Sequence, residues 1–75
     1  MDWLSFIKIM MMEERAAQAK YQLAVDLAES EETKALFRKL RDEEAFHAQF
    51  LEGEYTRLEK SLKHKSSGAA IAELT

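Results

Sequence analysis

The sequence predicts an all-α protein, folded as an antiparallel hairpin of two long helices. Of its 75 residues none is proline and only two are glycine, while alanine, leucine, glutamate and lysine are abundant. This composition favours helices over strands. The hydrophobic fraction of 47% is high for a chain that is too short to bury a large core by itself. We therefore expect the hairpin to associate with further copies of itself.

The first helix is expected over residues 2–29. Asp2 is a suitable N-cap, because its carboxylate can accept a hydrogen bond from a free backbone N–H of the first turn. At about 100° per residue, one face of this helix is apolar around a single glutamate, Glu14. The other residues expected on this face are Trp3, Ile7, Met10, Met11, Ala17, Tyr21, Val25 and Ala28.

The second helix is expected over residues 31–63, with Ser30 as its N-cap. Glu31 and Glu32 follow in the first turn, where the helix dipole favours negative charge. We expect residues 1–64 to form the hairpin and residues 65–75 to form a flexible tail. The inner face of the second helix is expected to hold Phe37, Leu40, Glu44, His47, Leu51, Tyr55, Leu58 and Leu62.

A second apolar stripe runs along the far side of the first helix. A helix that is buried on one side only normally carries charge on the other side. The stripe therefore predicts a second interface between copies, unless the first helix simply packs at the centre of a single dimer. Its residues are Ile9, Met12, Ala16, Ala19, Leu23 and Leu27.

The composition also excludes several kinds of site. With no cysteine, the chain has no disulfide, thiolate zinc site or iron–sulfur cluster, and a reducing cytoplasm is the expected compartment. The net charge of −3 and the lack of a basic stripe argue against nucleic-acid binding. The apolar start is interrupted by Asp2 and Lys8 and lacks the cleavage site of a signal peptide. We interpret it as the buried start of the first helix and expect no membrane contact.

Glu14, Glu44 and His47 are the candidate metal ligands. Because the turn between the helices is very short, Glu14 and Glu44 both lie about 21–23 Å from the bend and hence at the same level. His47 is about 60° round the helix from Glu44, in a Glu-x-x-His motif, so the three side chains can converge. Charge at a core position is costly unless it is neutralised, and a metal ion does this. Tyr21 is predicted either to hydrogen-bond to a ligating glutamate or to fill the core.

One hairpin offers too few ligands to enclose a pair of metal ions. Two hairpins related by a two-fold axis would make a four-helix bundle with four glutamates and two histidines. Four carboxylates would neutralise two divalent cations, and oxygen with imidazole ligands suits iron or manganese. We expect Glu44 to bridge the two ions and His47 to bind one ion terminally. The alternative is that Glu14 and Glu44 are surface residues and His47 is a satisfied interface histidine.

Two segments resemble a known family: ERAAQAKY at residues 14–21 and RDEEAFHA at residues 41–48. Over residues 12–58 the chain is similar to the rubrerythrin-like branch of the ferritin superfamily, in particular to the half-size encapsulated ferritins. The resemblance implies a ferritin-like four-helix bundle, with Glu14, Glu44 and His47 as ferroxidase ligands shared across a homodimer interface. It also implies that dimers associate into a ring, through the stripe on the far side of the first helix.

The same resemblance implies a role in iron storage or detoxification inside an encapsulin nanocompartment, reached through a C-terminal targeting peptide. Residues 71–75 depart from the usual targeting motif of that family. The sequence thus predicts a di-iron ferroxidase that oxidises Fe(II) to Fe(III), with two iron ions per dimer. The alternatives are a rubrerythrin-like protein that reduces peroxide with iron or manganese, and a helical dimerisation module without metal.

Overall fold

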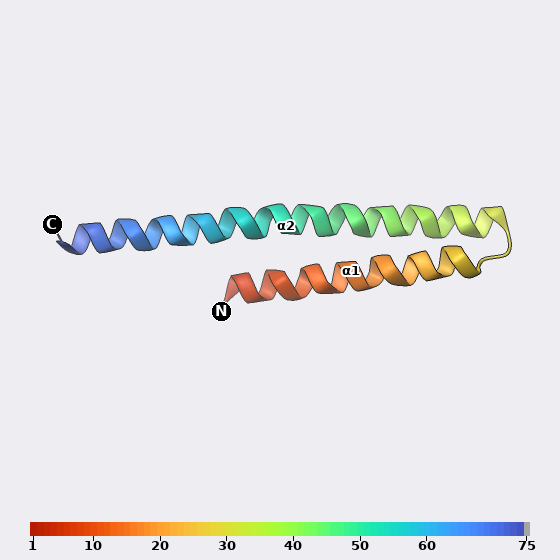
Figure 1. Cartoon of the computed structure of the whole chain (residues 1–75), viewed down its shortest axis with the longest axis horizontal. Helices are drawn as coiled ribbons and strands as arrows, with labels where there is room; N and C mark the ends of the chain where they lie inside the picture. Colours follow the sequence, from red (N-terminus) through yellow and green to blue (C-terminus); the bar gives the residue numbers. More distant parts are fainter. Residues whose placement is uncertain (75) are drawn as a thin grey trace.

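A computed structural model describes the backbone of residues 1–74 and the side chains of residues 1–63. The chain is an antiparallel pair of helices, α1 (Trp3–Leu27) and α2 (Glu31–Leu74), packed side by side (Figure 1). The molecule measures 68 × 16 × 13 Å. The predicted all-α class and the hairpin are confirmed for the described part of the chain.

The start of α1 follows from its cap. Oδ2 of Asp2 accepts a hydrogen bond from the Ser5 hydroxyl at 2.6 Å, and Oδ1 accepts one from the Ser5 backbone N–H at 3.3 Å. Both hydrogen bonds favour the ionised carboxylate and lower the pKa of Asp2. The bond from the Ser5 hydroxyl has the larger effect, and the bond from the Ser5 backbone N–H has the smaller one. The predicted N-cap is confirmed, and α1 begins at the next residue, Trp3.

The turn is built by two local features. Ala28 takes an extended conformation, with φ −67° and ψ 140°, so α1 ends at Leu27, slightly before the predicted end near residue 29. Ser30 then caps α2, because its Oγ accepts a hydrogen bond from the Thr33 backbone N–H at 3.1 Å. Glu31 lies in the first turn of α2, as predicted. The connection is therefore short enough to fold the helices back on each other.

The end predicted near residue 63 for α2 is wrong, because the backbone stays helical to Leu74. The chain has no proline to stop the helix, and a single glycine, Gly68, costs only about 1 kcal/mol in a helix interior. At 25 residues α1 is about 37 Å long, and at 44 residues α2 is about 66 Å long. The distal part of α2 therefore projects beyond the start of α1 (Figure 1). The predicted targeting role of residues 71–75 depends on side chains that lie outside the described residues, so it stays a prediction.

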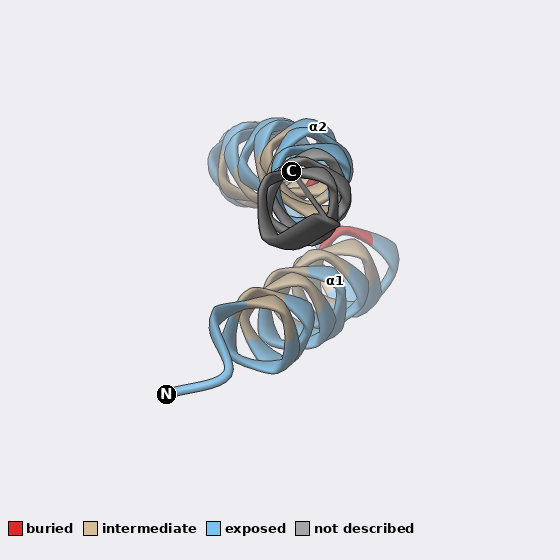
Figure 2. Cartoon of the chain, turned by 90° about the vertical axis from the view of Figure 1, so that its left-hand side faces the viewer, coloured by how far each residue is buried: buried red, intermediate tan, exposed pale blue. Residues whose placement is uncertain are grey.

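The contact between α1 and α2 buries little surface. Among the described side chains only Val25 and Ala48 are fully buried, at 7% and 0% exposure. The remaining inner face is half-covered (Figure 2). Trp3 and Leu62, predicted for the inner faces, are 57% and 44% exposed, because they lie where the two helices cease to overlap. A single hairpin thus lacks the core that a stable domain of this size needs.

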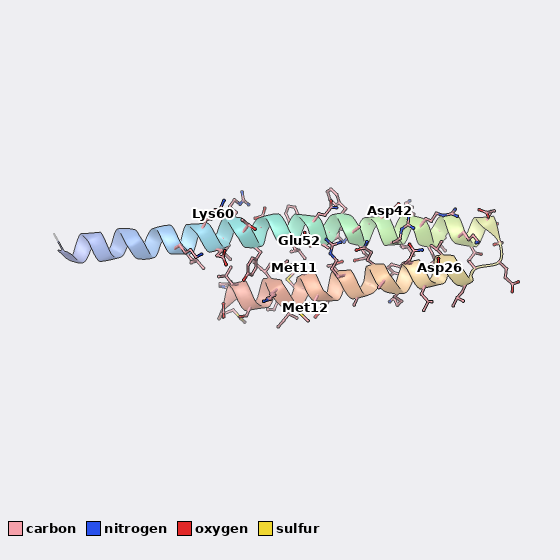
Figure 3. The ribbon with its side chains drawn as sticks, in the orientation of Figure 1. Met11, Met12, Asp26, Asp42, Glu52 and Lys60 are labelled. Carbon is pink, nitrogen blue, oxygen red and sulfur yellow. The ribbon has the colours of Figure 1, made fainter. Side chains whose placement is uncertain are left out.

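The outer surfaces carry many large apolar side chains. In Figure 3 Met11 lies between the helices, whereas Met12 lies on the far side of α1 and is 65% exposed. Apolar surface of this extent normally marks an interaction site. Within the described residues, neither helix has a stretch long and apolar enough to cross a membrane. The other exposed apolar residues include Phe6, Ile9, Leu23, Leu27, Leu36, Phe46 and Phe50.

Gly53 lies inside α2, and a Cβ added there meets nothing within 4 Å. The substitution Gly53→Ala should therefore raise the free energy of unfolding by about 0.5–1 kcal/mol, because alanine loses less backbone entropy in a helix. Ala35→Gly, at an exposed position of the same helix, is the matched control and should lower it by a similar amount. Urea denaturation measures both. Destabilisation by Gly53→Ala would show that this side of α2 is covered in the assembled protein.

Removal of the α2 cap should weaken the turn. Ser30→Ala removes the acceptor for the Thr33 N–H and should lower the free energy of unfolding by about 1 kcal/mol. Ser30→Asp restores an acceptor beside the positive end of the helix dipole and should recover the loss. Thermal denaturation of the three proteins gives the comparison, and equal midpoints for all of them would rule out a capping role.

Candidate metal centre

Glu14 of α1 and Glu44 and His47 of α2 meet midway along the overlap of the two helices. Each of the three offers a ligand atom that lies within 4.8 Å of the other two. Nδ1 of His47 is 3.5 Å from Oε2 of Glu14 and 3.7 Å from Oε2 of Glu44. The structure therefore brings together all three residues singled out in the sequence. Their role as metal ligands stays a prediction.

Packing on both sides of the cluster holds the helices in register. Toward the turn, the Tyr21 ring stacks on the Phe37 ring, with 6.2 Å between centroids. One helical turn beyond Glu44, Ala48 is completely buried, and its small side chain lets the two helices approach closely. Because Glu14 lies between these contacts on α1, its carboxylate reaches the level of Glu44.

The cluster is open on one side. The side chains of Glu14 and Glu44 are 27% and 22% exposed, whereas His47 is 54% exposed. The prediction that His47 lies on the buried inner face is therefore wrong. At about 60° from Glu44, the imidazole lies at the rim of the helix contact, where α1 no longer covers it. The two carboxylates thus line the floor of the cluster, and the imidazole lies at its opening.

One carboxylate oxygen at the floor has no partner. Oε2 of Glu14 is buried and accepts no hydrogen bond from the side chains and backbone that the structure describes. Nδ1 of His47, at 3.5 Å, is beyond the usual range for a hydrogen bond. A buried acceptor that stays unpaired costs about 1–3 kcal/mol, and more when it is charged. A cation held between the three residues would remove this cost, so the donor set fits a metal ion.

The charge around the cluster leads to the same conclusion. Arg15, the residue after Glu14, turns away and forms an ion pair with Glu52 at 2.7 Å. Within residues 1–63 no lysine or arginine forms an ion pair with Glu14 or Glu44. Two carboxylates thus lie together with only His47 beside them. Carboxylate and imidazole donors suit Fe(II) or Mn(II), without distinguishing between the two ions.

Tyr21 is placed by packing. Besides its stack on Phe37, its ring lies under the ammonium group of Lys20, with 5.1 Å from Nζ to the ring centroid. No hydrogen bond joins its hydroxyl to Glu14 or Glu44 among the side chains described. The structure thus accounts for Tyr21 as a core residue, and its role as a hydrogen-bond donor to a ligand stays a prediction.

Two exposed aromatic residues near the opening, Phe46 and Phe50, are not among the residues predicted from the sequence to form the site. Phe46 packs edge to face on the His47 ring, with 6.4 Å between centroids, and is 68% exposed. Phe50, one turn further along α2, is 59% exposed. Neither belongs to the inner face of the hairpin, so the helical periodicity around Glu44 does not select them. An aromatic pair on the outward side of a largely charged helix is the sequence feature that indicates them, because exposed apolar groups mark interaction sites.

No protein-family model, curated protein or solved structure matches this chain. The resemblance to the ferritin superfamily therefore rests on residues 14–21 and 41–48 and on the cluster that they form.

The unpartnered oxygen predicts an effect on the stability of the metal-free protein. Glu14→Gln removes one of two adjacent carboxylates while keeping the size of the side chain, and should raise the free energy of unfolding by about 1 kcal/mol. Glu13→Gln changes an exposed neighbour and should leave it unchanged. Urea denaturation in the presence of a chelator provides the measurement. A loss of stability in Glu14→Gln would mean that the carboxylate is already neutralised without a metal.

Proposed function

We propose that two copies of this hairpin form a ferroxidase, which binds Fe(II) at the Glu14–Glu44–His47 cluster and oxidises it to Fe(III). The observation that carries this proposal is the buried, unpartnered oxygen of Glu14 at the floor of a cluster that opens through His47. An enclosed cluster of this kind would be a structural ion site. An open one lets substrate and oxidant enter.

The donor count favours a site shared between two copies. One chain supplies two carboxylates and one imidazole, which leave most positions around an iron ion to water. Two copies supply four carboxylates and two imidazoles, which balance the charge of two Fe(II) ions. Glu44 is the better candidate for a bridging ligand, since His47 on the same helix can hold an ion terminally. This assembly would be a ferritin-like four-helix bundle, and Mn(II) could occupy the same ligands.

The chemistry follows from the ligand charges. Two Fe(II) ions give up one electron each, and O₂ takes up both electrons with two protons to form hydrogen peroxide. The carboxylates of Glu14 and Glu44 bind the more highly charged Fe(III) more strongly than Fe(II), so they favour oxidation. His47 contributes a neutral nitrogen ligand at the opening, where the oxidant enters. If hydrogen peroxide is the preferred oxidant instead, the protein belongs to the peroxide-reducing class.

The Fe(III) product must be stored elsewhere. A hairpin 16 × 13 Å across encloses no space for a mineral. We therefore propose that the protein delivers Fe(III) to a store outside itself, and the resemblance to encapsulated ferritins names an encapsulin shell as that compartment. The exposed stripe on α1 would then join dimers into a larger ring.

Iron binding and oxidation can be followed in one titration. Fe(II) added to the protein without oxygen should saturate near one ion per chain, and O₂ should then produce the ferric absorbance within seconds. Oxidation with hydrogen peroxide in place of O₂ distinguishes the two oxidants. If Fe(II) binding is no greater than in a buffer blank, the ferroxidase proposal is rejected in favour of a helical association module without metal.

Variants of the cluster test the assignment of each ligand. Glu14→Gln, Glu44→Gln and His47→Asn should each lower iron affinity by at least about tenfold, because each removes one of few ligands. Glu13→Gln, next to Glu14 but exposed, is the matched control and should bind iron normally. Unchanged iron affinity in all three cluster variants would show that iron binds elsewhere in the chain.

A further inference from the structure

We propose that the second copy docks on the side of the hairpin that carries His47, with the two α2 helices packed antiparallel. This inference rests on the proposed function and specifies which surface completes the site. It follows from a difference between the two broad sides of the hairpin.

One side is closed by polar bridges between the helices. Arg15 of α1 binds Glu52 of α2 at 2.7 Å, and Arg41 of α2 donates a hydrogen bond to Gln22 of α1 at 2.9 Å. Arg41 lies about 60° from Glu44 on α2. We call this side the bridged face. A partner that docked there would have to break or bury both bridges, and buried ionic groups are costly unless they stay paired.

Apart from the contact of His47 with Glu14 at 3.5 Å, the opposite side carries no polar bridge between the helices among residues 1–63, and His47 opens onto it. His47 lies about 60° from Glu44 in the direction away from Arg41, so we call this side the His47 face. Leu36 and Phe50, at about 80° and 120° in the same direction, belong to it. They are 54% and 59% exposed. The His47 face therefore offers apolar surface next to the opening of the metal cluster.

A shallow groove on α2 gives this surface its shape. Its volume is about 530 Å³, and it is lined by Lys39, Asp42, Glu43, Phe46 and His47. Phe46 lines the groove, and its ring and the imidazole of His47 pack in a T-shaped arrangement. Aromatic side chains beside a groove are the usual anchors of a protein interface. Because His47 lines both the groove and the metal cluster, a chain bound in the groove would cover the opening.

A second copy is the occupant that also completes the ligands. A two-fold axis at the level of Glu44 and His47 brings two identical clusters together across this face, since each cluster opens toward the axis. The same operation on the bridged face would separate the clusters by the thickness of both hairpins. The stripe on α1 points away from α2 altogether, so a contact there joins no ligands (Figure 3, where Met12 marks that side).

Charge selects the direction of packing. If α2 lay against α1 of the partner, Lys39 would meet Lys20, because the stack of Tyr21 on Phe37 places these two lysines at one level. With α2 antiparallel to α2, Lys39 of each copy instead approaches Glu54 near the other end of the face. Like charges in contact oppose association, whereas opposite charges favour it. The antiparallel arrangement therefore avoids the contact of Lys39 with Lys20, although it brings the two Glu43 side chains near the axis.

Cysteine crosslinking tests the face without any need for iron oxidation. The natural chain has no cysteine, so a single Glu43→Cys substitution places one thiol on the His47 face. Gln49→Cys is the matched control on the same helix, about 140° from Glu44 on the side of Arg41. With a short bismaleimide, and with Mn(II) present or absent, the Glu43→Cys protein should form a covalent dimer. The Gln49→Cys protein should stay monomeric on a denaturing gel.

Charge substitutions then test the apolar anchors. In the Glu43→Cys background, Phe50→Glu should lower the yield of covalent dimer about tenfold, the effect of about 1.4 kcal/mol on association. Leu23→Glu, on the α1 stripe, is matched in exposure (57% against 59%) and should leave the yield unchanged. Circular dichroism establishes that both variants keep their helices. Since Phe50 packs outside the hairpin, its substitution should not unfold the chain.

The results separate this inference from the proposed function. Crosslinking through Glu43→Cys without iron oxidation would keep the docking face and reject the ferroxidase. Iron oxidation together with crosslinking only through Gln49→Cys would keep the ferroxidase and overturn the docking face. Loss of the dimer in Leu23→Glu but not in Phe50→Glu would also overturn it, because the copies would then meet through the α1 stripe.

Discussion

The constraint on which this structure depends is the placement of two carboxylates at the contact between two helices. Glu14 and Glu44 approach each other with no lysine or arginine paired to either among the described side chains, and one oxygen of Glu14 is buried without a partner. Within residues 1–63, only His47 lies beside them. A folded chain tolerates such an arrangement where a cation balances it. The cluster is thus a local weakness of the hairpin and its most specific chemical feature.

A second constraint is the amount of surface that a hairpin can bury. Two helices have a single line of contact, and among the side chains of residues 1–63 only Val25 and Ala48 are buried along it. Most of the apolar surface stays outside, on the α1 stripe and around His47. In the proposed assembly the shortage of ligands and the uncovered surface have the same cause, because a single hairpin would be half of a bundle. Association with another copy would remove both the exposed apolar area and the shortage of ligands.

The two broad sides of the hairpin differ in how the helices are joined and in what they expose. The bridged face is held by Arg15 with Glu52 and by Arg41 with Gln22, which keep the helices level. The other side has no such bridges in the described part of the chain and carries His47. The polar bridges therefore hold the two helices in register, while the other side leaves His47 exposed.

The sequence by itself determined the two helices, their caps and the convergence of the cluster. Asp2 and Ser30 act through local hydrogen bonds, and the position of Glu14 and Glu44 relative to a short turn depends only on helical rise. Helical spacing could not decide where α2 ends, because no residue near 63 forces a stop. The exposure of His47 also depended on tertiary structure. A helical wheel gives the angle between His47 and Glu44. Whether α1 covers a side chain at that angle depends on how closely α1 packs against α2.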